Sequence, residues 1–178
     1  MSEYTLCSTA GKKEHGDLIE SFLDDHPAQS KRETVEGADA DFPTLKIKYD
    51  TGAEESVATT VAIMKSIGKS FGCYSTNQDQ KDPILELYCE LLDKLQNAGQ
   101  GEDQIEEFKT KALEFHKLCE QKLAEGANLK EDRETVADVC VRHYASAHVT
   151  KASSPVHAAI QNTLLDETPK FKALIDSL

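Results

Sequence analysis

The chain has 178 residues, enough to bury one large core or two smaller ones. Hydrophobic residues make up 39% of it and charged residues 29%, the balance of an ordinary soluble globular protein. The net charge of −12 argues against nucleic acid or an anionic membrane as a partner, because both require clustered Lys and Arg.

The histidines and cysteines lack the spacing of a metal or disulfide framework. None of the six histidines forms an HxxxH or HExxH pattern. His143 and His148 are expected on different sides of a helix, because they lie five residues apart. An odd number of cysteines without Cys-x-x-Cys spacing predicts reduced thiols and a reducing compartment. The five thiols are those of Cys7, Cys73, Cys89, Cys119 and Cys140.

Targeting and membrane signals are not found in the sequence. Its first residues do not resemble a signal peptide, and no apolar run approaches the roughly 18 residues of a membrane-spanning helix. We therefore expect a cytoplasmic protein, either free or within a larger cytosolic or ciliary assembly.

The first half of the chain alternates predicted strands and helices. The alternating apolar residues of 44–50 and the turn residues Thr51 and Gly52 predict a β-hairpin. Thr59 and Thr60 can cap the helix that follows, which Phe71-Gly72 ends. In chain order, we expect a strand at 3–8, a helix at 17–23, strands at 31–36, 44–50 and 54–58, and a helix at 61–67.

After residue 80 the sequence predicts only helices. Pro83 fits the first turn of a helix that reaches residue 95, and a second long helix is expected at 102–123. Thr135 and Asp138 have the spacing of a capping box, so a helix headed for the core should begin there and reach residue 149. Two further helices should open at Pro155 and Pro169.

Four segments resemble motifs of the cytosolic glutathione transferase family. The run Phe42-Pro43-Thr44-Leu45 resembles the family's L-P-x-L step, in which a cis proline opens the third strand. The run Thr59-Thr60-Val61-Ala62-Ile63 is similar to its Q/E-S-x-A-I helix start. Thr135-Val136-Ala137-Asp138 resembles its S/T-x-A-D box, and Thr168-Pro169-Lys170-Phe171-Lys172-Ala173-Leu174 its closing P-K-L-x-A-L segment.

These motifs occur in the family's order and span nearly the whole chain. The resemblance therefore implies the glutathione transferase fold, with an α/β thioredoxin-like N-terminal domain at 1–75 and an all-α C-terminal domain at 81–178. It also implies glutathione as substrate or ligand, with no metal.

The resemblance places a glutathione site on a few residues. The family's thiolate-stabilising donor, which activates glutathione by lowering its thiol pKa, falls near Ser8, with Cys7 as an alternative that could form mixed disulfides. Phe42 and Pro43 stand where the family pairs backbone with the tripeptide. Thr59 and Thr60 replace the pair that binds its γ-glutamyl carboxylate. Each of these residues could also have a purely structural role. Ser8 could be a polar residue at a strand end, Cys7 a small buried side chain, and the two threonines a simple helix cap.

The chain departs from the family where the second helix should be. Only residues 37–41 separate the strand at 31–36 from Phe42, and the chain has no Trp, although the family contacts glutathione there through Trp, Lys and Gln. Asp39 and Asp41 add negative charge where an anionic peptide should bind. An unmatched charge costs on the order of 1–3 kcal/mol, so affinity should fall about ten-fold or more. This shortened region predicts a weakened or lost site.

Two functions stay open. The first is a binding or structural subunit of a protein assembly, with a degenerate glutathione site. The second is an active Ser-type transferase that conjugates or reduces small electrophiles. The family pairs through the face between its small domain and the first bundle helices, so we expect a homodimer or another protein partner there. The expected contact residues are Ala62, Lys65 and Lys69 on one subunit, and Leu87, Glu90 and Leu91 on the other.

Overall fold

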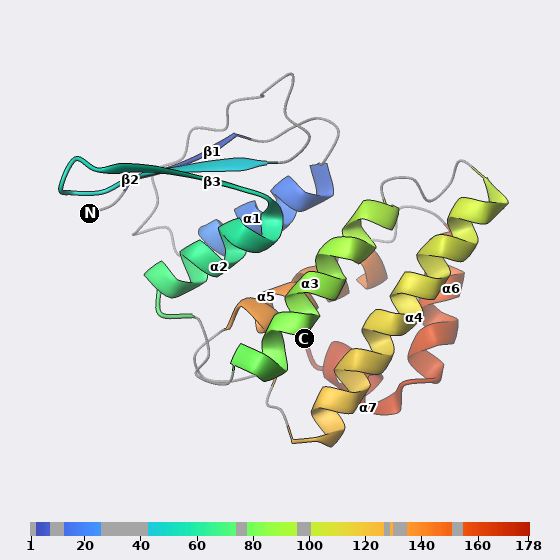
Figure 1. Ribbon diagram of the computed structural model, residues 1–178. Coiled ribbons are helices and arrows are strands. Elements are labelled where there is room, and N and C mark those ends of the chain that lie inside the picture. The colour runs from blue at the N-terminus through green and yellow to red at the C-terminus, as the bar shows by residue number, and fades with distance from the viewer. Residues whose placement is uncertain are drawn as a thin grey trace. The chain divides into compact units, whose positions relative to one another are not determined.

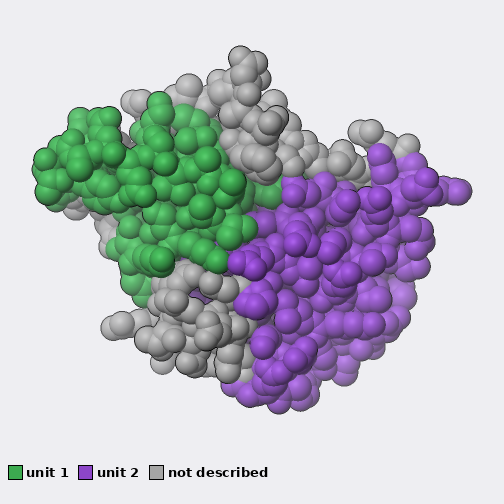
Figure 2. Space-filling model, in the orientation of Figure 1, with its two compact units in different colours: residues 1–74 green, residues 75–178 purple. Residues whose placement is uncertain are grey.

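The computed structural model describes residues 3–7, 13–25, 43–73, 78–95, 101–126, 129, 135–150 and 155–178. The chain forms two compact units, which Figure 2 colours separately: unit 1 is Met1–Tyr74 and unit 2 is Ser75–Leu178. The expected strand at 31–36 and the residues Ser8, Asp39, Asp41 and Phe42 lie outside the described residues. No helix in the described ranges is long and apolar enough to cross a membrane.

Unit 1 combines a three-stranded sheet with two helices on one of its faces (Figure 1). The strand order is β1-β2-β3, and both neighbouring pairs are antiparallel. The predicted hairpin is formed by β2 and β3. The elements are β1 (Glu3–Cys7), α1 (Lys13–Asp24), β2 (Thr44–Lys48), β3 (Glu54–Ala58) and α2 (Thr60–Ser70).

The core of unit 1 follows from alternation along the strands. Leu45 and Ile47 of β2 are buried, whereas Lys46 and Lys48 are exposed, because successive side chains of a strand point to opposite faces. The helices cover the apolar face with residues at helical spacing. The buried apolar side chains of unit 1 include Tyr4, Leu6, Leu18, Ile19, Phe22, Leu23, Ile63, Met64 and Ile67.

Helix α1 begins four residues earlier than the sequence suggested. The apolar pattern indicated a start at residue 17, but the helix begins at Lys13. Its first turns bury His15 and Gly16, which periodicity of apolar residues does not reveal. The imidazole of His15 is held inside by a polar partner, described below.

Every described element of unit 2 is helical, which confirms the predicted all-α class. Helix α3 packs against α4 and α5, while α4 also packs against α6 and α7 (Figure 1). The elements are α3 (Gln78–Leu95), α4 (Glu102–Ala124), α5 (Val136–Tyr144), the π-helical segment η3 (Ala145–Thr150), α6 (Pro155–Asp166) and α7 (Pro169–Ile175).

Helix α5 runs through the interior of unit 2 and begins at a buried capping box. The Asp138 carboxylate accepts hydrogen bonds from the backbone N–H of Thr135 at 2.7 Å and from its hydroxyl at 2.6 Å. The Asp138 N–H donates to the Thr135 hydroxyl oxygen at 3.4 Å. All residues of α5 except Arg142 are buried, so the central position expected for this helix is observed.

Three expectations for unit 2 were wrong in detail. Helix α3 begins at Gln78, so Pro83 lies inside the helix and not in its first turn; the preceding Gln and Lys are good helix formers and extend it. The helix expected to reach residue 149 changes at Ala145 to π geometry. Leu91, expected at a partner contact, is 0% exposed because it belongs to the core of unit 2.

Candidate functional site

The predicted site residues that the structure describes lie at one end of the unit 1 sheet. Cys7, Thr44 and Ala58 are aligned across the three strands. Pro43 directly precedes β2 and Thr59 directly follows β3, so both lie at this same end. The described residues contain no cis peptide bond. The expected cis bond between Phe42 and Pro43 stays a prediction, because Phe42 is outside them.

Cys7 is the final residue of β1 and is half-buried. Its position at the strand end fits the place where the resemblance expects a thiolate-stabilising group or a reactive thiol. Ser8, the preferred candidate, follows it directly outside the described residues. The structure therefore brings Cys7 into the same region as Pro43 and Thr59, and leaves the role of Ser8 as a prediction.

Thr59 caps α2 from a strained backbone conformation. Its φ is 72° and its ψ 139°, a region that β-branched residues avoid. Its hydroxyl oxygen accepts a hydrogen bond from the Ala62 N–H at 3.4 Å, which satisfies one of the free donors at the helix start. Such strain costs on the order of 1–3 kcal/mol and is concentrated at functional sites.

Thr60, the first residue of α2, has its hydroxyl inside the unit. The Thr60 Oγ1 lies 2.8 Å from the Nδ1 of His15 on α1. Both residues are buried, with 3% and 2% of their surface exposed. This hydrogen bond joins the starts of α1 and α2 across 45 residues of sequence. The side chain expected to face an anionic ligand is therefore turned toward a histidine of the protein.

The outer face of the sheet carries charges of both signs. Glu3, Lys48 and Glu54 are aligned across the strands, and so are Thr5, Lys46 and Ser56. Together with Ile47 and Glu55 they line a hollow of about 410 Å³. Because lysine and glutamate side chains face each other here, they largely neutralise one another and do not form a concentrated anion site.

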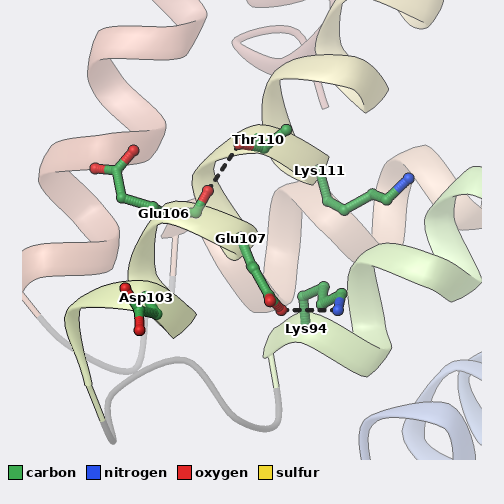
Figure 3. Close-up of a pocket in the computed structure, with 6 residues that line it drawn as sticks. All are labelled: Lys94, Asp103, Glu106, Glu107, Thr110 and Lys111. Atoms are coloured by element: carbon green, nitrogen blue, oxygen red, sulfur yellow. Dashed lines mark hydrogen bonds and ion pairs between the residues drawn. The ribbon is translucent and has the colours of Figure 1, made fainter.

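A second hollow, of about 510 Å³, lies on the surface of unit 2 between α3 and α4 (Figure 3). Several of its charged side chains are engaged in ion pairs. Lys94 lies 2.8 Å from Glu107, and Lys111 lies 2.8 Å from both Glu90 and Glu114. Exposed pairs of this kind contribute little stability and typically mark a solvated helix surface. We assign this hollow no ligand.

Sequence reasoning missed a cluster of buried polar rings in unit 2. The rings of His143 and His148 lie 5.6 Å apart, although the α-helical period predicts them on different sides. A π-helix bonds residues five apart, so the η3 geometry brings the two imidazoles together. The Tyr88 hydroxyl of α3 lies 2.6 Å from the His143 Nδ1. The periodicity of apolar residues in a sequence does not reveal a π-helical turn, so this cluster was not predicted.

A second polar network lies nearby in the same core. The Tyr144 hydroxyl donates to the Gln161 Oε1 and accepts from the His116 Nε2. Burial lowers the pKa of His116 to about 4, so its imidazole is neutral at physiological pH. Within the described ranges, no group of three or more His, Cys, Asp or Glu is placed to hold a metal ion.

Solved structures of glutathione transferases align with this chain. No family model matches the chain, and no curated protein matches it significantly. A glutathione S-transferase of Caenorhabditis elegans aligns with a TM-score of 0.61 at 16% identity, over 99% of this chain and 98% of that one. A sigma class glutathione transferase of Fasciola hepatica gives 0.61 at 14% identity, over 99% and 96%.

A glutathione transferase of Streptococcus pneumoniae, solved as a complex with glutathione, aligns with a TM-score of 0.60 at 15% identity. That alignment covers 94% of this chain and 77% of the other. At such identities a likeness establishes the architecture, and the order of elements agrees with it: sheet and two helices first, helices alone afterwards. The chain therefore has the glutathione transferase fold, with an α/β thioredoxin-like unit followed by an all-helical unit.

Proposed function

We propose that this is a glutathione-transferase-like protein with a degenerate glutathione site, which acts mainly as a binding or structural subunit of a protein assembly. The fold supports the first part of this proposal. The second part depends on the start of α2, where the family binds the γ-glutamyl carboxylate of glutathione.

The observation that carries the proposal is the hydrogen bond between Thr60 and His15. The hydroxyl that should meet the carboxylate is buried and 2.8 Å from an imidazole nitrogen. The neighbouring Thr59 is exposed, but its side chain is too short to replace a Gln or Glu, and its oxygen already accepts from Ala62. A carboxylate at this helix start would have backbone N–H groups as partners, but neither of the two expected side chains.

One observation favours the alternative, an active Ser-type transferase that conjugates or reduces small electrophiles. Thr59 keeps a backbone conformation that costs about 1–3 kcal/mol. A strained residue at the end of a strand, next to a helix N-terminus, is typical of a ligand site. In this alternative Ser8 would stabilise the glutathione thiolate, with Cys7 as a second candidate.

The partner would bind the exposed surface of α2 and α3. Of the expected contact residues, Lys69 and Glu90 are exposed, while Ala62, Lys65 and Leu87 are half-buried. We propose that this surface binds a second copy of the chain or another protein, in the cytoplasm or in an assembly there. Analytical ultracentrifugation of the purified chain, and of a Lys69→Glu variant, which adds a negative charge to the proposed contact, tests the homodimer directly.

Retention on glutathione-agarose followed by turnover of a chloronitrobenzene substrate tests the two functions. The proposal expects no retention by glutathione and no turnover above the uncatalysed rate. Retention with turnover that Ser8→Ala abolishes would overturn it in favour of the transferase. A Ser56→Ala variant, changed on the outer face of the sheet, is the matched control for loss of a hydroxyl in unit 1.

A further inference from the structure

Two buried histidines meet where α5 changes into the π-helical segment η3. His143 belongs to the last turn of α5 and His148 to η3, and their ring planes are inclined by 74°. A third buried histidine, His157 of α6, acts electrostatically on His148, while its own ring lies 4.9 Å from that of Phe108. The three histidines are 8%, 7% and 5% exposed, respectively. We call His143 and His148 the histidine cluster.

Aromatic rings from α3 and α5 enclose the cluster. The ring centroid of Tyr88 lies 6.0 Å from that of His143 and 6.3 Å from that of His148. The ring of Tyr144 lies 5.9 Å from His148. Tyr88 is fully buried, so its phenol and the imidazoles are shielded from water together. These ring contacts link α3, α5 and η3.

The charged groups around the cluster oppose protonation. Arg142 acts against a positive charge on His143, and both His143 and His157 act against one on His148. No carboxylate of the described residues is among the groups that act on these two rings. With burial as the main cause, the pKa of His143 falls to about 4 and that of His148 to about 3.

We propose that the histidine cluster is an acid-responsive latch, which holds η3 against α3 and α6 while its rings are neutral and releases η3 when they are protonated. In the neutral state the Tyr88 hydroxyl and the His143 Nδ1 share a hydrogen bond of 2.6 Å, and the imidazole carries a single proton. A second proton turns this ring into an imidazolium beside the His148 ring. None of the described groups that act on these rings offsets the charge, so its solvation by water requires η3 to open.

The π-helical segment is the element expected to open first. It is six residues long, and π-helical turns occur mainly as local insertions that depend on their surroundings. In the open state the rings regain an ordinary pKa near 6.5. The ratio of open to closed molecules therefore rises as the pH falls below about 6.5, by up to about tenfold per pH unit for each ring. The rise stops below the pKa values of the closed state.

Amide hydrogen exchange of the full chain at pH 7.5 and 5.5, corrected for intrinsic rates, tests the latch. Two rings predict a roughly hundredfold loss of protection for peptides spanning 143–150, because each contributes about tenfold over this interval. Peptides from β2 and β3, in unit 1, are the internal controls and should keep their protection. Unchanged protection in 143–150, or an equal loss in every peptide, would overturn the proposal.

A substitution separates the latch from general acid sensitivity. His148→Gln removes one titrating ring, so the loss of protection between the two pH values should shrink to about tenfold. The control is His116→Gln, which removes a buried histidine that contacts Tyr144 and lies outside the cluster. This variant should keep the hundredfold response. If His148→Gln does not fold, the wild-type comparison alone still decides, since it requires no variant.

Discussion

The capping box of α5 gives the most direct test of how unit 2 is stabilised. Its geometry is uneven, because the short hydrogen bonds are those to the Asp138 carboxylate, at 2.6 and 2.7 Å, while the bond to the Thr135 hydroxyl oxygen is 3.4 Å. Both residues are buried, at 8% and 4% exposure. The carboxylate should therefore contribute more stability than the threonine oxygen.

The magnitudes follow from this difference. Asp138→Ala removes two charge-assisted hydrogen bonds and leaves the Thr135 N–H without its acceptor, at a cost of about 3–4 kcal/mol. Thr135→Ala removes the N-cap side chain and should cost about 1–2 kcal/mol. Thr135→Ser keeps the hydroxyl, and with it all three hydrogen bonds of the capping box, and should cost less than about 0.5 kcal/mol. For a unit of this size, the loss at Asp138 corresponds to a fall in Tm of roughly 12 °C or more.

Urea unfolding followed by circular dichroism measures these differences. A suitable control is Thr163→Ala in α6, because the Thr163 hydroxyl is exposed and donates to a carbonyl of its own helix; it should change the free energy of unfolding by about 0.5 kcal/mol or less. The reasoning is refuted if Thr135→Ala is as destabilising as Asp138→Ala, or if both cost less than about 1 kcal/mol.

Three further predictions concern strain, thiol reactivity and pH. Thr59→Gly should stabilise the protein by about 1 kcal/mol in urea unfolding, because glycine tolerates a φ of 72° and can serve as an N-cap. Thr59→Ala keeps the backbone strain and loses the cap, so it should destabilise the protein by a similar amount. Native protein should react with an aromatic disulfide reagent at Cys7 and Cys73 only; the other three thiols are buried, and burial raises the pKa of Cys89 to about 12. Finally, the neutral, buried His116 stabilises the fold above pH 6.5, and this contribution is lost as the pH falls toward its folded pKa of about 4. Between pH 7 and 5 the loss is about 2 kcal/mol, so His116→Gln should flatten the pH dependence of urea unfolding by that amount; equal slopes would contradict this.

Local signals in the sequence were sufficient for most of the architecture. The Thr135-x-x-Asp138 spacing gave the start of the central helix, because a capping box is made by residues of one turn. The alternation of 44–48 gave the buried face of β2 for the same reason. Gly72, with a φ of 70°, follows the end of α2, where a left-handed residue is the common helix stop.

Features that depend on tertiary contacts could not be predicted. Thr168 is the N-cap residue of α7, but its hydroxyl donates to the Leu164 carbonyl of α6 and does not cap the helix. The Phe171 N–H at the start of α7 instead donates at 2.7 Å to the Glu120 carboxylate of α4, 51 residues away. No local spacing indicates such a pair, so sequence reasoning could not anticipate it.

The candidate site shows the same difference between local signals, which the sequence reveals, and tertiary contacts, which it does not. Thr59 and Thr60 were singled out because they open a helix, and the structure places them at its start. The hydrogen bond that turns Thr60 inward is made with His15, a residue whose burial could not be expected from the sequence. The histidine cluster was dismissed from the sequence because the α-helical period separates residues five apart, and only π geometry joins them.

The central claim is that the glutathione site at the start of α2 is degenerate. Isothermal titration calorimetry of the wild-type chain with reduced glutathione measures this directly. We predict no saturable heat up to about 1 mM ligand, which corresponds to a binding free energy weaker than roughly 4 kcal/mol. A saturable one-to-one isotherm with a Kd of about 100 μM or tighter, lost in Ser8→Ala, would contradict the account.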